Sequence, residues 1–252
     1  MTDAPPILEL RDVEASYGPF RSLFGVSFSI AEGGVTALLG GNGSGKTTVV
    51  RVCSGLLHPI GGQVLYQGED VTQMRAYRLS RLGVVHAPEG RSVFATLSVE
   101  DNLNLTFRQA FGRTGCRGAL DQAFTLFPRL GERRRQQAGT LSGGEQRMLS
   151  LARVLVRAPK VLITDELSLG LAPLIIDEVY ETLATIHEHG TALLIVEQHV
   201  RQALTLADHV VVMGKGRVSL SGLTEELGDV TERIMPAIQG ERGSGNGTRA
   251  GS

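Results

Sequence analysis

The chain has 252 residues with a formal net charge of −1, and 42% of its residues are hydrophobic. These values suit one or two compact domains with a substantial core, and the balanced charge argues against a nucleic-acid partner. No apolar run reaches the roughly 18 residues that would span a bilayer. The chain also starts without a signal-peptide pattern, and its cysteines lack metal-ligand spacing, so we expect a protein of the reducing cytosol.

Two segments that alternate apolar and polar residues, 7–13 and 26–30, open the chain and predict strands. Turn residues follow each of them, which favours an antiparallel opening beside a parallel α/β core. Tyr17 lies at the first turn, upstream of a glycine-rich segment at 40–48. Two interpretations stay open for this side chain: it stacks on a nucleobase, or it packs as an ordinary tyrosine.

The segment 40–48, GGNGSGKTT, matches the pattern G-x-x-x-x-G-K-[ST] of phosphate-binding loops. An apolar strand candidate, residues 35–39, comes before it. The residues after it that share one helical face are Val49, Val52, Cys53 and Leu56. Strand, glycine loop and helix in this order are the context that the motif requires. We therefore interpret the segment as a phosphate-binding loop rather than as a glycine-rich turn with a surface lysine.

The chemistry of such a loop follows from its geometry. Glycines let consecutive backbone N–H groups converge on an anion, and the N-terminus of the next helix favours negative charge. Lys46 is expected to reach the β- and γ-phosphates, and the Thr47 hydroxyl is expected to ligate Mg²⁺. The residues of this segment that we predict to bind nucleotide are Gly40, Asn42, Gly43, Ser44, Gly45, Lys46, Thr47 and Thr48.

The middle of the chain changes from strands to helices. Residues 63–66 and 82–86 predict two further strands. After them, Ser98 is a candidate N-cap, and a helix is predicted over 119–126. The pattern therefore predicts a helical subdomain, about residues 89–157, inserted into an α/β core. That core is expected to cover residues 7–88 and 158–222.

The sequence LSGGEQ at residues 141–146 closes the helical part. Ser142 and Glu145 form the S-x-x-E capping box of a helix start. The two glycines between them are not needed for a cap, and they leave N–H groups at the helix N-terminus open to a second anion. The apolar face of the helix that follows consists of Met148, Leu151, Ala152 and Leu155.

An apolar strand candidate begins at Val161, and it carries two carboxylates at its carboxyl end, Asp165 and Glu166. Parallel α/β sheets bind their ligands at the carboxyl ends of the strands. Acidic residues after an apolar run often mark no more than a strand end, but here they lie downstream of a phosphate loop. We therefore expect Asp165 to hold Mg²⁺ through its water shell, and Glu166 to polarise the attacking water.

The last part of the chain predicts more α/β structure. A helix is expected from Pro173 to Gly190, then a buried strand over 191–196 and a second helix over 200–207. A hairpin is expected over 209–220, with its turn at Gly-Lys-Gly. Residues 241–252 are rich in Gly, Ser and other residues that cannot bury a core, so we predict a disordered tail there.

The order of phosphate loop, LSGGEQ and apolar strand with Asp-Glu resembles the ATP-binding subunits of ABC transporters, over roughly residues 8–222. Within that family, the chain looks most similar to the ATPase subunit of branched-chain amino acid importers. The segments that carry this likeness are 88–91 (PEGR), 168–173 (SLGLAP) and 196–204 (VEQHVRQAL), with Ala207-Asp208.

The resemblance implies a P-loop NTPase (RecA-like) α/β core with an antiparallel β subdomain and an inserted helical subdomain. These parts would form a single nucleotide-binding domain over residues 1–240. The resemblance also implies a head-to-tail dimer, in which ATP lies between the phosphate loop of one copy and the LSGGEQ turn of the other. The nucleotide contacts expected from that turn are Ser142, Gly143, Gly144 and Glu145.

The partners implied by the resemblance are transmembrane permease subunits, a second and usually different ATPase, and indirectly a substrate-binding protein. The chain would then work peripherally at the cytoplasmic face of the plasma membrane, closing on ATP and opening after hydrolysis. Docking is expected near Glu89 and the helical part. The candidates for the docking groove are Phe94, Leu97 and Val99. An interpretation of these residues as core of the helical subdomain is supported at least as well.

Several positions depart from the wider family. Glu89 stands where most members have a glutamine that contacts Mg²⁺. Gln198 stands at the switch histidine and His199 follows it, so either of these two residues could meet the γ-phosphate during catalysis. Leu167 replaces a proline, and Thr164 puts a hydroxyl in the apolar strand. We expect slower or looser coupling rather than loss of activity.

Other functions compatible with the motifs stay open. A related importer for urea, amides or other amino acids would share every motif, as would the ATPase of an exporter. A soluble ABC ATPase of translation or DNA repair would resemble tandem cassettes or carry a coiled-coil insertion, and this chain has one cassette and no heptads. Import of branched-chain amino acids is the function that the resemblance favours.

Overall fold

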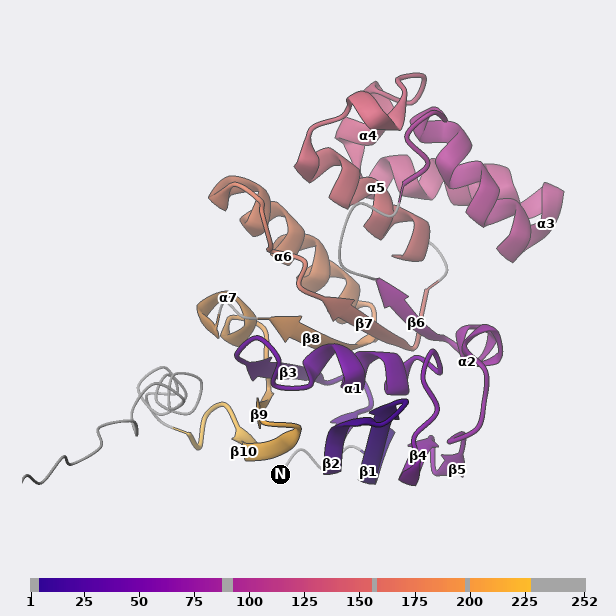
Figure 1. Cartoon of the computed structure of the whole chain (residues 1–252). Helices are drawn as coiled ribbons and strands as arrows, with labels where there is room; N and C mark the ends of the chain where they lie inside the picture. Colours follow the sequence, from indigo (N-terminus) through magenta and orange to yellow (C-terminus); the bar gives the residue numbers. More distant parts are fainter. Residues whose placement is uncertain (1–4, 88–92, 156–157, 198–199, 228–252) are drawn as a thin grey trace, which may run out of the picture.

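The computed structural model describes residues 5–87, 93–155, 158–197 and 200–227. An antiparallel sheet and a mostly parallel sheet form the lower part of the molecule in Figure 1, and helices α3 to α5 lie above them. The strands are β1 (Pro6–Tyr17), β2 (Phe20–Ala31), β3 (Val35–Gly40), β4 (Gly61–Tyr66), β5 (Glu69–Asp70), β6 (Val84–Ala87), β7 (Val161–Asp165), β8 (Ala192–Glu197), β9 (His209–Gly214) and β10 (Arg217–Leu223). The helices are α1 (Lys46–Cys53), α2 (Ala76–Leu82), α3 (Val99–Leu126), α4 (Pro128–Glu132), the 3₁₀ turn Ala138–Thr140, α5 (Gly143–Leu155), α6 (Pro173–Glu188) and α7 (Val200–Leu204).

The antiparallel sheet has the strand order β2-β1-β4-β5. In β1, Leu8 and Leu10 are buried on one face, whereas Glu9 and Arg11 form an ion pair on the other, which is the alternation that the sequence predicts. The predicted strands at the start of the chain are therefore confirmed. The observed strands β1 and β2 are longer than the predicted ones, because their pairing continues to Tyr17 and Phe20, on either side of the turn that joins them.

The second sheet has the order β10-β9-β3-β8-β7-β6, and all neighbours from β9 to β6 run parallel. Its central strands are buried on both faces, which explains their continuous apolar sequences. In the strand register, Leu39 lies beside Glu197, and Asp165 lies beside Val196. The carboxyl ends of β3, β7 and β8 therefore meet at one edge of the sheet, where the phosphate loop begins.

The two faces of the parallel sheet belong to two separate cores. Leu38 and Val196 pack in one core with Val49 of α1 and with the antiparallel sheet. Leu39 packs in the other core with Leu151 of α5 and with α6 and α7. As a result, α1 and α5 lie on opposite faces of the sheet (Figure 1).

Between β6 and β7 the chain is helical, as the sequence predicts. Ser98 caps α3 by accepting a hydrogen bond from the Asp101 backbone N–H at 3.0 Å, which confirms the predicted cap. The helix is longer than expected: it continues across Gly112, whose φ of 69° interrupts the regular geometry. Val99 is fully buried in the first turn of α3, so its interpretation as core is confirmed and its place in a docking groove is wrong.

Two local predictions were wrong. Leu56 was expected on the apolar face of the helix after the phosphate loop, but α1 ends at Cys53 and Leu56 is 59% exposed. The strand expected from residue 82 begins at Val84, because the preceding residues form α2, which ends at Gly83 with a φ of 103°. Helix α2 has only one buried side chain, so its sequence carries little periodicity. The predicted tail at 241–252 lies outside the described residues.

Candidate functional site

The phosphate loop connects the end of β3 to the start of α1, and two of its glycines are required by close packing. A Cβ atom on Gly40 would lie 2.6 Å from both the Met213 carbonyl oxygen and the Ser44 hydroxyl. Gly45 is the N-cap of α1 with a φ of 106°, a conformation that L-residues rarely adopt. Around Gly43 there is open space, so the outer side of the loop can admit a ligand.

Lys46 is buried in this loop with 4% of its surface exposed. Its ammonium donates hydrogen bonds to the carbonyl oxygens of Gly40 at 2.9 Å and Gly41 at 3.2 Å. Burial lowers the pKa of Lys46, and the carboxylates of Glu166 and Asp165 act in the opposite direction. The lysine therefore lies inside the loop that was predicted to bind phosphate, with carboxylates nearby.

The hydroxyl groups of the loop have different environments. The Ser44 hydroxyl is buried and has no hydrogen-bond partner among the residues that the structure describes, and such a group suits a phosphate oxygen. The Thr48 hydroxyl is bonded to Ser22 of β2 at 2.8 Å, so its side chain holds the loop against the antiparallel sheet. Asn42 and Thr47 are exposed and can reach a ligand.

The acidic pair at the end of β7 faces this loop. A Glu166 carboxylate oxygen lies 3.7 Å from the Lys46 ammonium, although the two residues are far apart in sequence. Glu166 has a φ of 47°, its N–H donates to the Val196 carbonyl at 2.9 Å, and its carbonyl accepts from Arg147 at 3.2 Å. Asp165 is 4% exposed. The tertiary structure thus brings together the lysine and the two carboxylates that the sequence singled out.

The sequence did not single out Arg147 or Glu197, yet both fix the segment around Glu166. Arg147, from α5, donates a hydrogen bond to the Glu166 carbonyl. Glu197, at the end of β8, accepts two hydrogen bonds from Ser168. Both side chains are almost completely buried. A charged residue inside an otherwise apolar strand such as β8 is the one sequence signal that could have identified Glu197.

The LSGGEQ turn forms the predicted capping box. The Ser142 N–H donates to the Glu145 carboxylate at 2.8 Å, and the Glu145 N–H donates to the Ser142 hydroxyl at 3.3 Å. Burial would raise the pKa of Glu145, but the hydrogen bonds from Ser142 and the charge of Arg133 together lower it. A Cβ atom on Gly144 would overlap the Ile175 side chain, so this glycine is needed for the contact with α6.

Helix α5, which begins at this turn, and helix α1, which follows the phosphate loop, pack on opposite faces of the parallel sheet. No hydrogen bond or ion pair within the described part of the chain joins Ser142 to Lys46.

Tyr17 lies at the end of β1 and is 39% exposed. The guanidinium carbon of Arg51 is 5.6 Å from the centre of its ring, and the Tyr17 hydroxyl accepts a hydrogen bond from Arg51 at 3.2 Å. Part of the ring is covered and part is open to solvent. Stacking of Tyr17 on a nucleobase stays a prediction.

Three of the predicted site residues, Glu89, Gln198 and His199, lie outside the described residues. Among the residues that are described, no group of three His, Cys, Asp or Glu side chains could hold a metal ion. Within the same ranges, no helix is long and apolar enough to cross a membrane.

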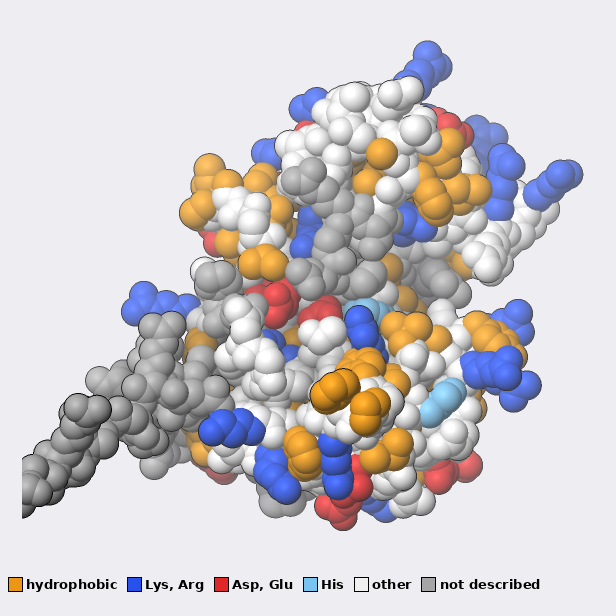
Figure 2. All heavy atoms as spheres, viewed as in Figure 1, with side chains coloured by type: hydrophobic (Ala, Val, Ile, Leu, Met, Phe, Trp, Pro, Cys, Tyr) orange, Lys and Arg blue, Asp and Glu red, His pale blue; other side chains and the backbone are white. Residues whose placement is uncertain are grey.

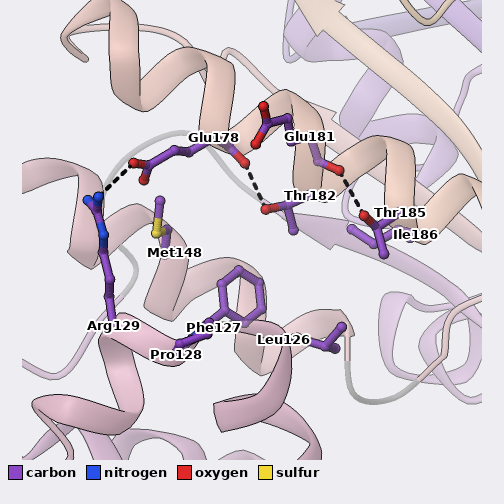
Figure 3. A pocket seen from close by; sticks show the side chains of 10 residues that line it. All are labelled: Leu126, Phe127, Pro128, Arg129, Met148, Glu178, Glu181, Thr182, Thr185 and Ile186. Atoms are coloured by element: carbon purple, nitrogen blue, oxygen red, sulfur yellow. Dashed lines mark hydrogen bonds and ion pairs between the residues drawn. The ribbon is translucent and has the colours of Figure 1, made fainter.

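Two grooves flank the helical part. The first, about 330 Å³, lies between the Leu126–Arg129 corner and α6, and the ion pair of Arg129 with Glu178 crosses its end at 3.1 Å (Figure 3). The second, about 420 Å³, lies between α2, β6, α3 and α5. Neither groove contains Lys46, Asp165 or Glu166. The grooves are therefore separate from the nucleotide site.

Comparisons with known proteins agree with this geometry. A family profile described as ABC transporter matches residues 23–168. The chain is 38% identical to the high-affinity branched-chain amino acid transport ATP-binding protein BraG of Pseudomonas aeruginosa, over 84% of this chain and 91% of that protein. It is 29% identical to BraF of the same organism, over 94% of this chain and 98% of that protein. The solved ADP conformation of MJ1267, an ATP-binding cassette of an ABC transporter, is 26% identical with a TM-score of 0.82, covering 94% of this chain and 98% of that one.

Proposed function

Because the chain belongs to the ABC transporter family and is an ATP-hydrolysing subunit of it, we propose that it drives the import of branched-chain amino acids. The similarity to BraG, which is named for that transport, supports this choice of substrate. The alternatives are import of urea, amides or other amino acids, and export, because ATPases of this fold share the same nucleotide site. The chain is proposed to act as a single nucleotide-binding domain over residues 1–240.

The observation that carries the proposed mechanism is the approach of Glu166 to Lys46, at 3.7 Å across the phosphate loop. In the proposed mechanism, the loop N–H groups and Lys46 bind the β- and γ-phosphates of ATP, and Lys46 turns from the loop carbonyls toward them. Glu166 then orients the attacking water and accepts its proton. Gln198 or His199 is proposed to contact the γ-phosphate from the end of β8, and Tyr17 to stack on the base.

The site also contains oxygen donors that suit Mg²⁺. The exposed Thr47 hydroxyl follows Lys46, and the Asp165 carboxylate lies at the facing strand end. Mg²⁺ prefers such hard oxygen ligands and keeps several waters, so one or two protein groups together with phosphate oxygens are enough. We propose Thr47, Asp165 and Glu89 as the residues that hold it. Mg²⁺ would neutralise negative charge on the phosphates.

The LSGGEQ turn is proposed to bind the ATP held by a second ATPase subunit in a head-to-tail dimer. Its nucleotide contacts would be Ser142, Gly143, Gly144 and Glu145. A heterodimer is favoured over a homodimer, because one organism has both BraF and BraG, and this chain is similar to both.

The groove between α2, β6, α3 and α5 is the proposed docking site for a transmembrane permease subunit. Phe94 is 51% exposed beside it, with the Arg153 guanidinium 5.2 Å from the centre of its ring. Tyr77 and Leu82 of α2 are also exposed, and Figure 2 shows hydrophobic side chains gathered over α2. His86 lines the groove, and burial and Arg51 lower its pKa to about 4. It is therefore neutral at pH 7, and the rest of the lining combines aliphatic side chains with hydroxyl groups and the Arg153 guanidinium. The groove is therefore suited to a segment that has both apolar side chains and hydrogen-bond acceptors.

Purification of the tagged full chain from membranes in mild detergent tests this proposal. We expect two multi-span permeases and a second ATPase of similar size, and a co-encoded binding protein that takes leucine, isoleucine or valine. A binding protein that takes urea or an amide would replace the substrate class. Recovery of ribosomal or DNA-repair proteins would overturn the transport function and leave the ATPase chemistry intact.

A further inference from the structure

Glu197 is a buried carboxylate that the mechanism above does not use. It is the last residue of β8, and only 1% of its surface is exposed. A buried carboxylate is costly unless hydrogen bonds satisfy it. Glu197 lies close to the proposed hydrolysis site, because the carbonyl of the preceding residue, Val196, accepts a hydrogen bond from the backbone N–H of Glu166.

The carboxylate of Glu197 binds one residue through both of its oxygens. Oε1 accepts the Ser168 backbone N–H at 3.0 Å, and Oε2 accepts the Ser168 hydroxyl at 2.7 Å. Ser168 is itself 2% exposed, and it stands two residues after Glu166. Hydrogen bonds to a charged acceptor are stronger than neutral ones, and a two-point contact also fixes orientation.

The segment that these bonds hold is strained. Glu166 has a φ of 47°, and a residue with a side chain keeps such a conformation only where its surroundings impose it. Contacts among the described residues contribute to this. The Val196 carbonyl accepts the Glu166 N–H, Arg147 donates to the Glu166 carbonyl, and Glu197 anchors Ser168.

We propose that Glu197 is a positioning residue for ATP hydrolysis: by anchoring Ser168, it keeps the strained Glu166 turned toward Lys46. This inference rests on the proposed role of Glu166 as general base. Glu197 touches neither ATP nor water in this role. A displacement of about 1 Å in a reacting group can cost on the order of 100-fold in rate, so loss of the anchor should slow hydrolysis without weakening nucleotide binding.

A rival explanation is electrostatic. Burial lowers the pKa of Lys46, and the negative charge of Glu197 is one of the charges that oppose this effect. Two substitutions separate position from charge. Glu197→Asp keeps the charge, but it is one methylene too short to bind Ser168 at both points. Glu197→Gln removes the charge and keeps the length, since its amide oxygen can accept the Ser168 N–H and its NH₂ group can donate to the hydroxyl.

The experiment measures ATP affinity and single-turnover hydrolysis for both variants in the full chain, with the exposed Glu181→Ala as the matched control. We expect Glu197→Asp to slow hydrolysis by about 10- to 100-fold with ATP affinity within about twofold of the parent, and Glu197→Gln to stay within about threefold in both. Hydrogen–deuterium exchange of the peptide that contains Ser168 should accelerate in Glu197→Asp and not in Glu197→Gln.

The opposite ranking would overturn the inference. Normal hydrolysis in Glu197→Asp excludes positioning, and weaker ATP binding in Glu197→Gln alone supports the charge effect. If both variants fail to fold, Ser168→Ala removes one of the two bonds with little change of volume, and a parental rate in it would contradict the role. Glu166→Gln is measured in parallel: normal hydrolysis there refutes the general base itself, whereas a slow Glu166→Gln beside normal Glu197 variants refutes only the anchor.

Discussion

At the scale of single residues, the site is built around the buried ammonium of Lys46 and the carboxylates near it. Lys46 is held by two backbone carbonyls, which are neutral acceptors, so it can exchange them for the charged oxygens of a phosphate. Glu166 lies within 3.7 Å of the same ammonium. Removing either residue tests a different step, because Lys46 is proposed to bind phosphate and Glu166 to accept a proton.

Glu166→Gln is expected to bind ATP and close the dimer as the parent does, but to turn over about 10²- to 10⁴-fold more slowly. Glutamine has nearly the same shape and cannot accept a proton from water. ATP affinity and phosphate release under single-turnover conditions check this prediction. Normal hydrolysis in this variant would show that Glu166 is not the base.

Lys46→Ala is expected to weaken nucleotide binding instead. A hydrogen bond that involves a charged group contributes about 1.5–3 kcal/mol, which corresponds to roughly a 10- to 100-fold loss of ATP affinity. Titration calorimetry with ATP measures the change. Because the side chain is almost fully buried, thermal unfolding without nucleotide is the control that separates lost binding from lost folding. An unchanged affinity would contradict the assigned contact.

At the scale of secondary-structure elements, Gly144 of the LSGGEQ turn has a packing role as well as a proposed ligand role. Gly144→Ala would place a methyl group against Ile175 of α6, and overpacking of this kind costs about 1–3 kcal/mol. The free energy of unfolding should fall by that amount in the absence of nucleotide. Gly118→Ala is the matched control, since a Cβ atom there meets nothing within 4 Å in α3. A stability equal to the parent would mean that α5 and α6 adjust without cost.

The ion pair between Arg129 and Glu178 links α4 to α6 across the groove of Figure 3, but it should contribute little. The two side chains are 57% and 31% exposed, and ion pairs at that exposure are worth roughly 0–1 kcal/mol. Glu178→Ala is therefore expected to lower the free energy of unfolding by less than about 1 kcal/mol and to leave ATP affinity unchanged. Chemical denaturation checks it, and a larger loss would show that this contact fixes the helical part on the core.

At the scale of the whole molecule, the proposed nucleotide site is divided between the phosphate loop of one subunit and the LSGGEQ turn of another. A bulky, charged substitution, Ser142→Arg, is therefore expected to leave ATP binding by the phosphate loop intact and to prevent hydrolysis. Mixing it with Lys46→Ala tests the division, since the mixed pair has one site with both halves unaltered. Partial recovery of hydrolysis in the mixture is expected. No recovery at any ratio would contradict a head-to-tail dimer of two copies of this chain. For the favoured heterodimer, Ser142→Arg in this chain is paired instead with the phosphate-loop lysine variant of the second ATPase, and no hydrolysis by that pair would contradict the head-to-tail arrangement.

The sequence by itself determined the local elements that have a strong pattern. The phosphate loop, the cap at Ser98, the capping box of Ser142 and Glu145, and the strand that ends in Asp165 all follow from short-range rules of spacing and turn chemistry. Elements with weak periodicity were missed or shortened. Helix α2 buries one side chain, and α3 is interrupted by Gly112, so neither presents a continuous apolar face.

Only the tertiary structure decided which distant residues act together. The parallel register sets Asp165 beside Val196 and Leu39 beside Glu197, and this brings Lys46, Glu166 and Glu197 to one edge of the sheet. The same packing places Ile175 so close to Gly144 that a side chain there would overlap it, and it buries Val99. Spacing along the chain reports neighbours within a few residues, whereas the anchor of Ser168 on Glu197 joins the turn after β7 to the end of β8, and the order of these strands is fixed only when the sheet assembles.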